Sequence, residues 1–392
     1  MAKIIHFPQD FLWGSATSAY QVEGGIENSD WSRIFPAGLA CDHYRLYEKD
    51  FDLLKELSQN AYRFSIEWSR IEPTEGRFNE KEIEHYRRVL KALRERGVKS
   101  MVTLHHFTLP LWLARRGGFA NSQSVFYFSR FAEKMFKEYG EIVDFWVTLN
   151  EPLIYATVMA PLLKKKNGLG LPDLPAILLT IKNEISAHRK THEVFHRLAK
   201  ESKTAVYVGI AKNNAYFVPF NPKSFLDRLA VGLCRYFWNG YFLDRIKDRL
   251  DFIGLNYYFH HQIKFPFFLK QKKKLISDLG WEVFPEGIYH ALLELKKYQL
   301  PIYITENGVA DAEDKLREEF IEGHLSWIGR AIEEEVDVRG YFHWSLIDNF
   351  EWDKGFGPRF GLIEIDYETM ERKIRPSARE YAKISRENKL VQ

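Results

Sequence analysis

The chain has 392 residues, 45% of them hydrophobic, and its 56 lysines and arginines nearly balance 53 aspartates and glutamates, for a net charge of +3. This balance argues against a nucleic-acid-binding protein and against a strongly acidic partner. No run of 18 apolar residues occurs, which argues against a membrane-spanning helix.

Strand-like and helix-like segments alternate along the whole chain. The predicted strands cover residues 11–16, 60–66, 99–104, 144–149, 205–211, 251–256, 301–305 and 338–345. The predicted helices cover residues 47–58, 80–96, 124–139, 175–199, 224–249, 285–298, 314–335 and 375–388. Eight such repeats without a flexible linker predict an α/β protein in which residues 1–392 form a single (β/α)8 TIM barrel. An open doubly wound sheet is the rival, but no G-x-G-x-x-G follows the first strand.

Two of the predicted strands end in a glutamate. Glu306 ends the apolar strand 301–305 and precedes the turn pair Asn307-Gly308, while Glu151 follows the strand 144–149 through Asn150. Because the carboxyl ends of barrel strands carry the active site, we expect these glutamates to face each other. For either glutamate alone, a solvated side chain at a strand end is the alternative.

Other predicted strands also end in polar or aromatic groups. They are Gln21 near the first strand, Arg63 inside the second, His105-His106 after the third, Asn256-Tyr257-Tyr258 after the sixth, and Trp344 with Glu351-Trp352 after the eighth. Aromatic residues make up 15% of the chain, and their faces stack well on sugar rings. We therefore interpret these groups as a saccharide site, although aromatic residues also fill cores.

The adjacent histidines His105 and His106 raise the alternative of a zinc site. Neither a His-Glu-x-x-His pattern nor a cysteine cluster accompanies them. We therefore expect no metal, and nothing in the sequence indicates another cofactor.

Five segments closely resemble the motifs of glycoside hydrolase family 1, the β-glucosidases and their relatives. In chain order they are residues 11–24 (FLWGSATSAYQVEG), 63–70 (RFSIEWSR), 148–152 (TLNEP), 304–308 (ITENG) and 348–352 (DNFEW). The resemblance extends from Phe7 to about Pro376. It implies a TIM barrel whose active site lies at the C-terminal ends of the strands, and a retaining exo-β-glycosidase activity.

The same resemblance implies the roles of the catalytic groups. Glu151 is expected to be the acid/base, Glu306 the nucleophile, Arg63 the cation beside the nucleophile, and Tyr258 the hydroxyl that points at it. Retention of configuration requires carboxyl groups about 5 to 5.5 Å apart. We expect the charge of Glu306 to raise the pKa of Glu151 and keep it protonated for the first step. For Tyr258, packing in the core is the alternative.

The resemblance also implies a set of sugar-binding residues: Gln21, His106, Asn150, Trp344, Glu351 and Trp352. Phe360 resembles a pocket aromatic, with core packing as the alternative, and Trp281 resembles a platform for the aglycone. The carboxylate of Glu351 is expected to repel a 6-phosphate, so the expected substrates are unphosphorylated β-glucosides, with β-galactosides and β-fucosides also accepted. A transglycosylase and a non-catalytic sugar-binding protein are the functional alternatives.

The chain is shorter than is usual for the family, with shortened loops expected near residues 158–172 and 214–250. These loops shape the aglycone side, so we hypothesise a more open or more mobile site there. The basic and aromatic segment 263–274 could touch a membrane or an amphiphilic aglycone. The favoured alternative is a loop over the rim of the site with its lysines in water, so membrane binding is not expected.

Two features bear on the location of the protein. Cys41 and Cys234 are the only cysteines and lie far apart, which favours a reduced, cytoplasmic compartment. The N-terminal apolar run is broken at Pro8 and Asp10, before a signal-peptide core could form. The sequence leaves the natural aglycone and the oligomeric state open.

Overall fold

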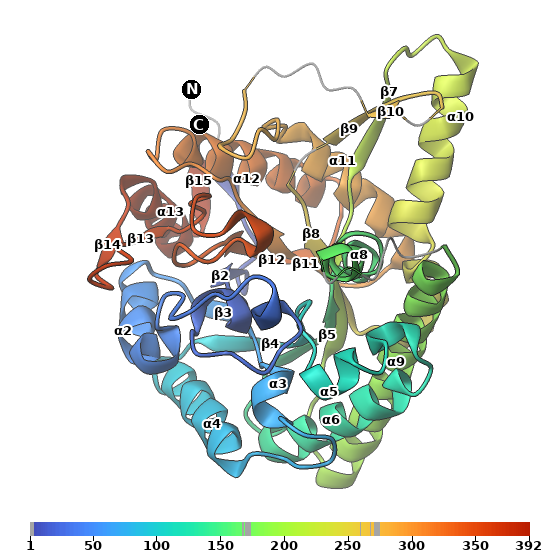
Figure 1. Ribbon diagram of the computed structural model, residues 1–392. Coiled ribbons are helices and arrows are strands. Elements are labelled where there is room, and N and C mark those ends of the chain that lie inside the picture. Colours follow the sequence, from blue (N-terminus) through green and yellow to red (C-terminus); the bar gives the residue numbers. More distant parts are fainter. Residues whose placement is uncertain (1–3, 167, 169–173, 259, 267, 270–274) are drawn as a thin grey trace.

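Eight parallel strands close into a barrel in the computed structural model, which describes residues 4–166, 168, 174–258, 260–266, 268–269 and 275–392 (Figure 1). The strands are β2 (Leu12–Ala16), β3 (Ala61–Ser65), β4 (Lys99–His105), β5 (Phe145–Asn150), β6 (Val208–Asn213), β8 (Phe252–Asn256), β11 (Ile302–Asn307) and β12 (Val338–Trp344). The pairing of β12 with β2, from Gly340 opposite Leu12 to Trp344 opposite Ala16, closes the ring. All eight predicted strands and the predicted TIM barrel are confirmed.

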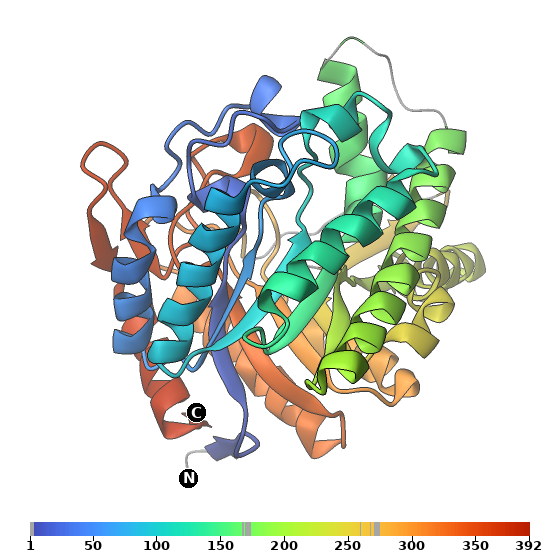
Figure 2. The same ribbon diagram turned by 90° about the horizontal axis from the view of Figure 1, so that it is seen from below.

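Long helices surround the barrel (Figures 1 and 2). They are α2 (His43–Glu56), α4 (Glu80–Glu95), α6 (Ser124–Tyr139), α9 (Leu174–Ser202), α10 (Phe225–Cys234), α11 (Glu286–Leu295), α12 (Arg317–Glu333) and α13 (Pro376–Glu387). Most of them pack an apolar face against the barrel, whereas α10 packs against two strands outside it, β7 (Tyr216–Pro219) and β9 (His260–Lys264). In α6 the buried residues Tyr127, Phe128, Phe131, Ala132 and Met135 follow the helical repeat. The helix α4 begins at a cap, where the side chain of Asn79 accepts from the backbone N–H of Lys81.

Short helical elements lie mostly in the loops. The α-helical ones are α1 (Ala19–Val22), α3 (Trp68–Ile71), α5 (Leu111–Ala114), α7 (Pro152–Ile154) and α8 (Ala160–Lys166). The 3-10 and π-helical ones are η1 (Trp31–Arg33), η2 (Gly118–Ala120), η3 (Tyr155–Met159), η4 (Arg235–Gly240), η5 (Leu243–Arg245), η6 (Lys247–Arg249), η7 (Lys296–Tyr298) and η8 (Trp352–Lys354). Within the described residues, no helix is long and apolar enough to cross a bilayer.

The predicted continuous helix over 224–249 is wrong. The helix α10 ends at Cys234, the π-helical turn η4 follows, and two short 3-10 turns lead to β8. A physical reason lies at Asn239, whose side chain accepts from the backbone N–H of Ala215 and donates to its carbonyl. Asparagine side chains that bond to other backbone groups compete with a regular helix.

Smaller sheets lie outside the barrel. The strands β7 (Tyr216–Pro219), β9 (His260–Lys264) and β10 (Phe268–Leu269) form a three-stranded sheet in the order β10-β9-β7, which the sequence did not predict. Two-stranded pairs join β1 (Ile4–His6) to β15 (Lys389–Val391) and β13 (Ile363–Ile365) to β14 (Arg372–Ile374). The first pair brings the two ends of the chain together (Figure 2).

Candidate active site

A cavity of about 1080 Å³ opens where the barrel strands end. Its wall includes Asn150, Asn213 and Trp344, the last residues of β5, β6 and β12, and Glu306, the last residue but one of β11. Of the predicted site residues, all but Arg63 line the cavity: Gln21, His106, Asn150, Glu151, Tyr258, Trp281, Glu306, Trp344, Glu351, Trp352 and Phe360. The twelfth, Arg63, is buried directly behind Glu306.

The carboxylate of Glu306 is held from both sides. Arg63 donates from Nη1 to Oε1 at 2.5 Å, and the hydroxyl of Tyr258 donates to Oε2 at 2.7 Å. Burial raises the pKa of Tyr258, so its hydroxyl stays protonated and acts as the donor. The two predicted neighbours of Glu306 therefore each bind one of its oxygens.

Glu151 is held differently, without a cationic ion-pair partner among its described contacts. It directly follows β5 in the left-handed backbone region, with φ of 44°, and it is buried. Its Oε1 accepts from Nδ2 of Asn256 at 2.8 Å and from Nδ2 of Asn213 at 3.3 Å. Burial, and secondly the nearby charge of Glu306, raise its pKa to about 7. The expected rise is present, but burial is its larger cause.

One hydrogen-bond network joins the two glutamates. The Oδ1 atom of Asn150 accepts from Nη2 of Arg63 at 2.7 Å and from Nδ2 of Asn256 at 3.1 Å. Arg63 also binds Glu306, and Asn256 also binds Glu151. Each carboxyl group is therefore connected to Asn150 by hydrogen bonds through one intervening side chain. The network fixes both carboxyl groups relative to the same amide.

His106 lies between this network and the aromatic wall. Its Nε2 accepts from Nδ2 of Asn150 at 3.2 Å, and its ring is nearly parallel to those of Trp344 and Trp352, with interplanar angles of 17° and 12°. Burial lowers the pKa of His106, so the ring is neutral. Its Nδ1 has no hydrogen-bond partner among the described residues. A neutral ring that accepts at Nε2 carries its proton at Nδ1, where a ligand hydroxyl could accept it.

The neighbouring His105 does not line the cavity. Its ring packs against those of Phe119 and Tyr155, with centroids 5.1 and 4.8 Å away. The potential metal-ligand group found among the described residues is instead His192, His196 and Asp251, on α9 and at the start of β8.

Gln21 and Glu351 form a second polar group of the cavity. The Nε2 atom of Gln21 donates to Oε2 of Glu351 at 3.2 Å, to Oδ1 of Asn349 at 2.9 Å and to the carbonyl of Phe350 at 3.0 Å. Enclosure by the cavity wall, and secondly the charge of Glu306, raise the pKa of Glu351 to about 8. Near neutral pH this carboxyl group is therefore largely protonated, which weakens the expected charge repulsion of a 6-phosphate.

The aromatic residues Trp281 and Phe360 gather around Tyr258. The rings of Trp281 and Phe360 have centroids 5.7 and 6.4 Å from that of Tyr258, and they lie 6.3 Å from each other. Phe360 is buried in the core and also contributes to the cavity wall. The segment 263–274 lies partly outside the described residues, because residues 267 and 270–274 are not described.

Three residues that contact the network were absent from the predicted site. Asn256 was noted only as a strand end, although it binds Glu151 and also accepts from the hydroxyl of Thr305 at 2.7 Å. Lys212 and Asn213 were missed because the predicted fifth strand stops at residue 211, whereas β6 extends to Asn213. Burial lowers the pKa of Lys212 to about 7. An inspection of the residues just after 211 would have found both.

Known proteins resemble this chain over nearly its whole length. The sequence profile of glycosyl hydrolase family 1 matches residues 3–247 and 243–390. Beta-glucosidase A of Thermotoga maritima is 33% identical over 445 aligned positions, which cover 98% of this chain and 98% of the relative. The beta-galactosidase of Pyrococcus woesei is 32% identical, with 93% and 94% covered. Because 445 aligned positions exceed the 392 residues of this chain, the relative has positions that this chain lacks.

Solved structures agree with the sequence comparison. The beta-glycosidase from Pyrococcus horikoshii superposes with a TM-score of 0.91 at 38% identity, covering 99% of this chain and 96% of that chain. The beta-glucosidase from Thermotoga maritima in complex with glucoimidazole gives a TM-score of 0.90 at 33% identity, with 98% and 99% covered. By its sequence, its barrel and the order of its strand-end motifs, this chain belongs to glycosyl hydrolase family 1.

Proposed function

We propose that this protein is a retaining exo-β-glycosidase that hydrolyses β-glucosides and also accepts β-galactosides and β-fucosides. The observation that carries the proposal is the pair of buried glutamates on one network in unlike environments: Glu306 is paired with Arg63, while the pKa of Glu151 is raised to about 7. Two carboxyl groups with such different environments are suited to opposite tasks. Relatives named beta-glucosidase and beta-galactosidase support β-glucosides and β-galactosides as substrates.

In the first step, a carboxylate oxygen of Glu306 attacks the anomeric carbon while Glu151 gives its proton to the glycosidic oxygen. The bond between that carbon and the leaving oxygen breaks, the alcohol departs, and a covalent glycosyl ester of Glu306 forms. Arg63 and Tyr258 orient Glu306 for the attack. Asn150 is placed to bind the 2-hydroxyl of the sugar, a contact that strengthens in the transition state.

In the second step, Glu151 acts as a base. Esterification removes the charge of Glu306, which is the second cause of the raised pKa of Glu151, so this pKa falls. Glu151 then accepts a proton from water as the water oxygen attacks the anomeric carbon, and Glu306 leaves as a carboxylate. Two successive inversions return the sugar with its original β configuration.

The enclosed sugar end of the cavity supports recognition of a terminal, unphosphorylated sugar. Gln21, Trp344 and Trp352 are buried and line this end of the cavity, which supports binding of a terminal sugar between an amide and aromatic faces. Among the described lining residues, Lys354 is the only lysine or arginine, and it is paired with Asp353 at 2.7 Å. A 6-phosphate would therefore lack a free cation even though Glu351 is largely protonated.

The decisive experiment uses an aryl β-glucoside and the variant Glu306→Ala. We expect kcat to fall on the order of 10⁴-fold or more, because the nucleophile is lost. Added azide should occupy the vacated space and restore part of the turnover, yielding the α-glucosyl azide by a single inversion. The variant Glu364→Ala, on the outer strand β13, serves as the matched control and should keep its activity.

Two results would contradict the proposal. One is an active Glu306→Ala variant without azide, and the other is an azide product of β configuration. Product analysis with an added acceptor sugar in the same assays separates hydrolysis from transglycosylation, because only the latter yields a new glycoside.

A further inference from the structure

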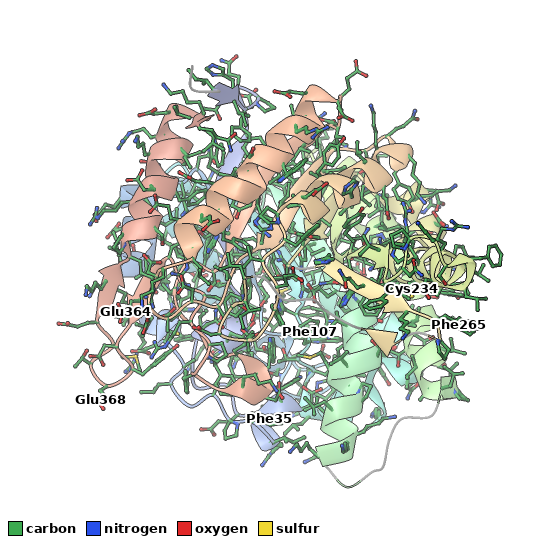
Figure 3. The ribbon with its side chains drawn as sticks, turned by 90° about the horizontal axis from the view of Figure 1, so that it is seen from above. Phe35, Phe107, Cys234, Phe265, Glu364 and Glu368 are labelled. Carbon is green, nitrogen blue, oxygen red and sulfur yellow. The ribbon has the colours of Figure 1, made fainter. Side chains whose placement is uncertain are left out.

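We infer that the part of the cavity beyond Glu151 binds a long apolar aglycone, so that the substrates are β-glycosides of alkyl or similarly elongated apolar alcohols. This inference rests on the proposed function and specifies its substrate class. The region concerned, here the apolar chamber, is the part of the cavity lined by η3, α9, β7, β9, α10 and η4. In the view of Figure 3, Phe107 lies near the middle of the molecule and Cys234 toward α10, and both line the cavity.

The first wall of the apolar chamber is one face of α9. Leu174, Ile177, Leu178 and Ile181 line the cavity and recur at helical spacing. Leu174 is 66% exposed and Leu178 is 53% exposed, so these two side chains are open to the cavity, whereas Ile177 and Ile181 line it and also pack against the core. An apolar face that a fold leaves uncovered inside a cavity indicates a site for an apolar ligand.

The second wall comes from α10 and η4. Leu233, Phe237, Trp238 and Tyr241 line the same cavity at helical spacing. Leu233 is 40% exposed and Phe237 is 56% exposed. Both walls lie on the same side of the barrel (Figure 1), and the second falls within residues 214–250, where the family resemblance predicts a shortened loop.

A chain of hydrogen bonds connects the apolar chamber to Glu151. The indole Nε1 of Trp238 donates to Oδ1 of Asn213 at 3.3 Å, and Nδ2 of Asn213 donates to Oε1 of Glu151 at 3.3 Å. The apolar chamber therefore begins one side chain away from the group that would protonate the leaving oxygen. The leaving alcohol must depart from that oxygen, so its chain extends into the apolar chamber.

The chemistry of the walls selects the kind of alcohol. A second sugar would bury several hydroxyl groups, each of which needs a hydrogen-bond partner. Most described side chains of the apolar chamber are leucine, isoleucine or aromatic. Its polar groups are few: the hydroxyl of Thr157 already donates to the carbonyl of Leu153 at 2.6 Å, the indole of Trp238 donates to Asn213, and the His261 ring and the Tyr241 hydroxyl also belong to the lining. An apolar chain gains from the same walls, because it removes their exposed surface and its own from water.

The test measures kcat/KM for β-glucosides of unbranched alcohols from ethanol to decanol, each below its micelle concentration. These alcohols have similar acidity, so the chemistry is nearly constant and the series reports binding of the chain. We expect kcat/KM to rise about twofold to fourfold with each methylene until the apolar chamber is full. An aryl β-glucoside assayed in parallel tests the proposed function separately.

Matched variants locate the effect. The double variant Leu178→Gln with Leu233→Gln places an amide in each wall, so kcat/KM should increase less with each added methylene. For the octyl glucoside kcat/KM should fall about tenfold or more, whereas for the ethyl glucoside it should change less than twofold. The control pair, Leu179→Gln with Leu229→Gln, lies on the same helices. Leu179 and Leu229 are 46% and 48% exposed and do not belong to the cavity lining, so the control should match the unmodified protein.

The outcomes are distinguishable. If kcat/KM does not change with the length of the alkyl chain while the aryl glucoside is hydrolysed, the inference is overturned and the proposed function stands. Inactivity on every glycoside overturns the proposed function. A flat series in which the wall variants change the molar mass in solution assigns the apolar chamber to an interface between copies of this chain, and also overturns the inference. The inference is also overturned if the increase of kcat/KM with chain length is lost equally in the wall pair and in the control pair, because the increase then does not arise from these walls.

Discussion

The two ends of the cavity are built in opposite ways. At the sugar end, polar side chains from within β3 and from the ends of β5, β8 and β11 bind one another, so that Arg63, Asn150 and Asn256 fix both glutamates. At the apolar chamber, helices present leucines and aromatic rings, several of which are exposed to the cavity. This difference supports a division of tasks: the barrel provides the preorganised charges for the reaction, and under our proposal the helices after β5 and β6 select the leaving group.

Among variants that test the comparison of the two ends, the largest effect should come from Glu151→Gln, at the residue that joins them. For an alkyl glucoside we expect kcat to fall about 10³- to 10⁴-fold, because an alkoxide leaves poorly without a proton. For a dinitrophenyl glucoside, whose leaving group needs no proton, formation of the glycosyl ester should slow far less. Rapid-mixing kinetics on both substrates measure the difference.

The pH dependence of the same variant provides its control. An acid must be protonated to act, and the pKa of Glu151 is about 7, so kcat/KM of the unmodified protein should decline as the pH rises through about 7. Glu151→Gln should lose this decline. If variant and unmodified protein decline together, another group is the acid.

A second, smaller effect is expected from Arg63→Lys at the sugar end. Lysine keeps the charge but cannot bind Glu306 and Asn150 at once, as the two Nη atoms of Arg63 do. We expect kcat/KM to fall about 10²-fold for every alkyl glucoside, with the same rise per methylene, since the apolar chamber is untouched. The substitution Arg45→Lys, in a surface pair with Asp42, should change nothing. A change in the rise per methylene would contradict the separation of the two ends.

The two ends also differ in how well the sequence predicts them. Each glutamate directly follows an apolar strand, so the strand pattern together with the barrel closure was enough to bring Glu151 and Glu306 to one cavity. Asn213 was missed because Lys212 and Asn213 interrupt the apolar pattern although they still pair as a strand with Leu255 and Asn256. Polar residues at a strand end are hard to distinguish from a loop by pattern alone.

The apolar chamber could not be predicted from the hydrophobic pattern of the sequence, for a different reason. The spacing of Leu233, Phe237 and Tyr241 is that of an ordinary amphipathic helix, for which burial against the barrel is the expected outcome. The π-helical turn η4, which follows the regular helix after Cys234, contains Asn239, and Asn239 bonds to Ala215, which lies 24 residues away in the chain. Local periodicity carries no information about such a contact.

At the junction of the two ends, Asn213→Ala should have a moderate effect. Its hydrogen bond favours the ionised form of Glu151 and so lowers the pKa of Glu151. Without this bond the pKa of Glu151 should rise above about 7, and the decline of kcat/KM should move to higher pH. At pH 6, kcat/KM itself should fall about tenfold or less, because one hydrogen bond that positions Glu151 is lost. A pH-rate profile on an aryl glucoside measures both. A decline that moves to lower pH would contradict the role of Asn213 as a donor to Glu151.

The smallest expected effect concerns folding stability and addresses why the apolar chamber has leucines at all. Leu178→Gln and Leu233→Gln should each change the free energy of unfolding by no more than about 0.5 kcal/mol, because both side chains are already exposed to the cavity. The fully buried Leu325 of α12 gives the contrast, since Leu325→Ala should cost about 2 to 5 kcal/mol. Denaturant unfolding of the three variants measures both. A destabilisation of 2 kcal/mol or more by either glutamine would assign that leucine to the fold; if instead stability is unchanged while the octyl glucoside alone loses kcat/KM, these leucines serve the ligand.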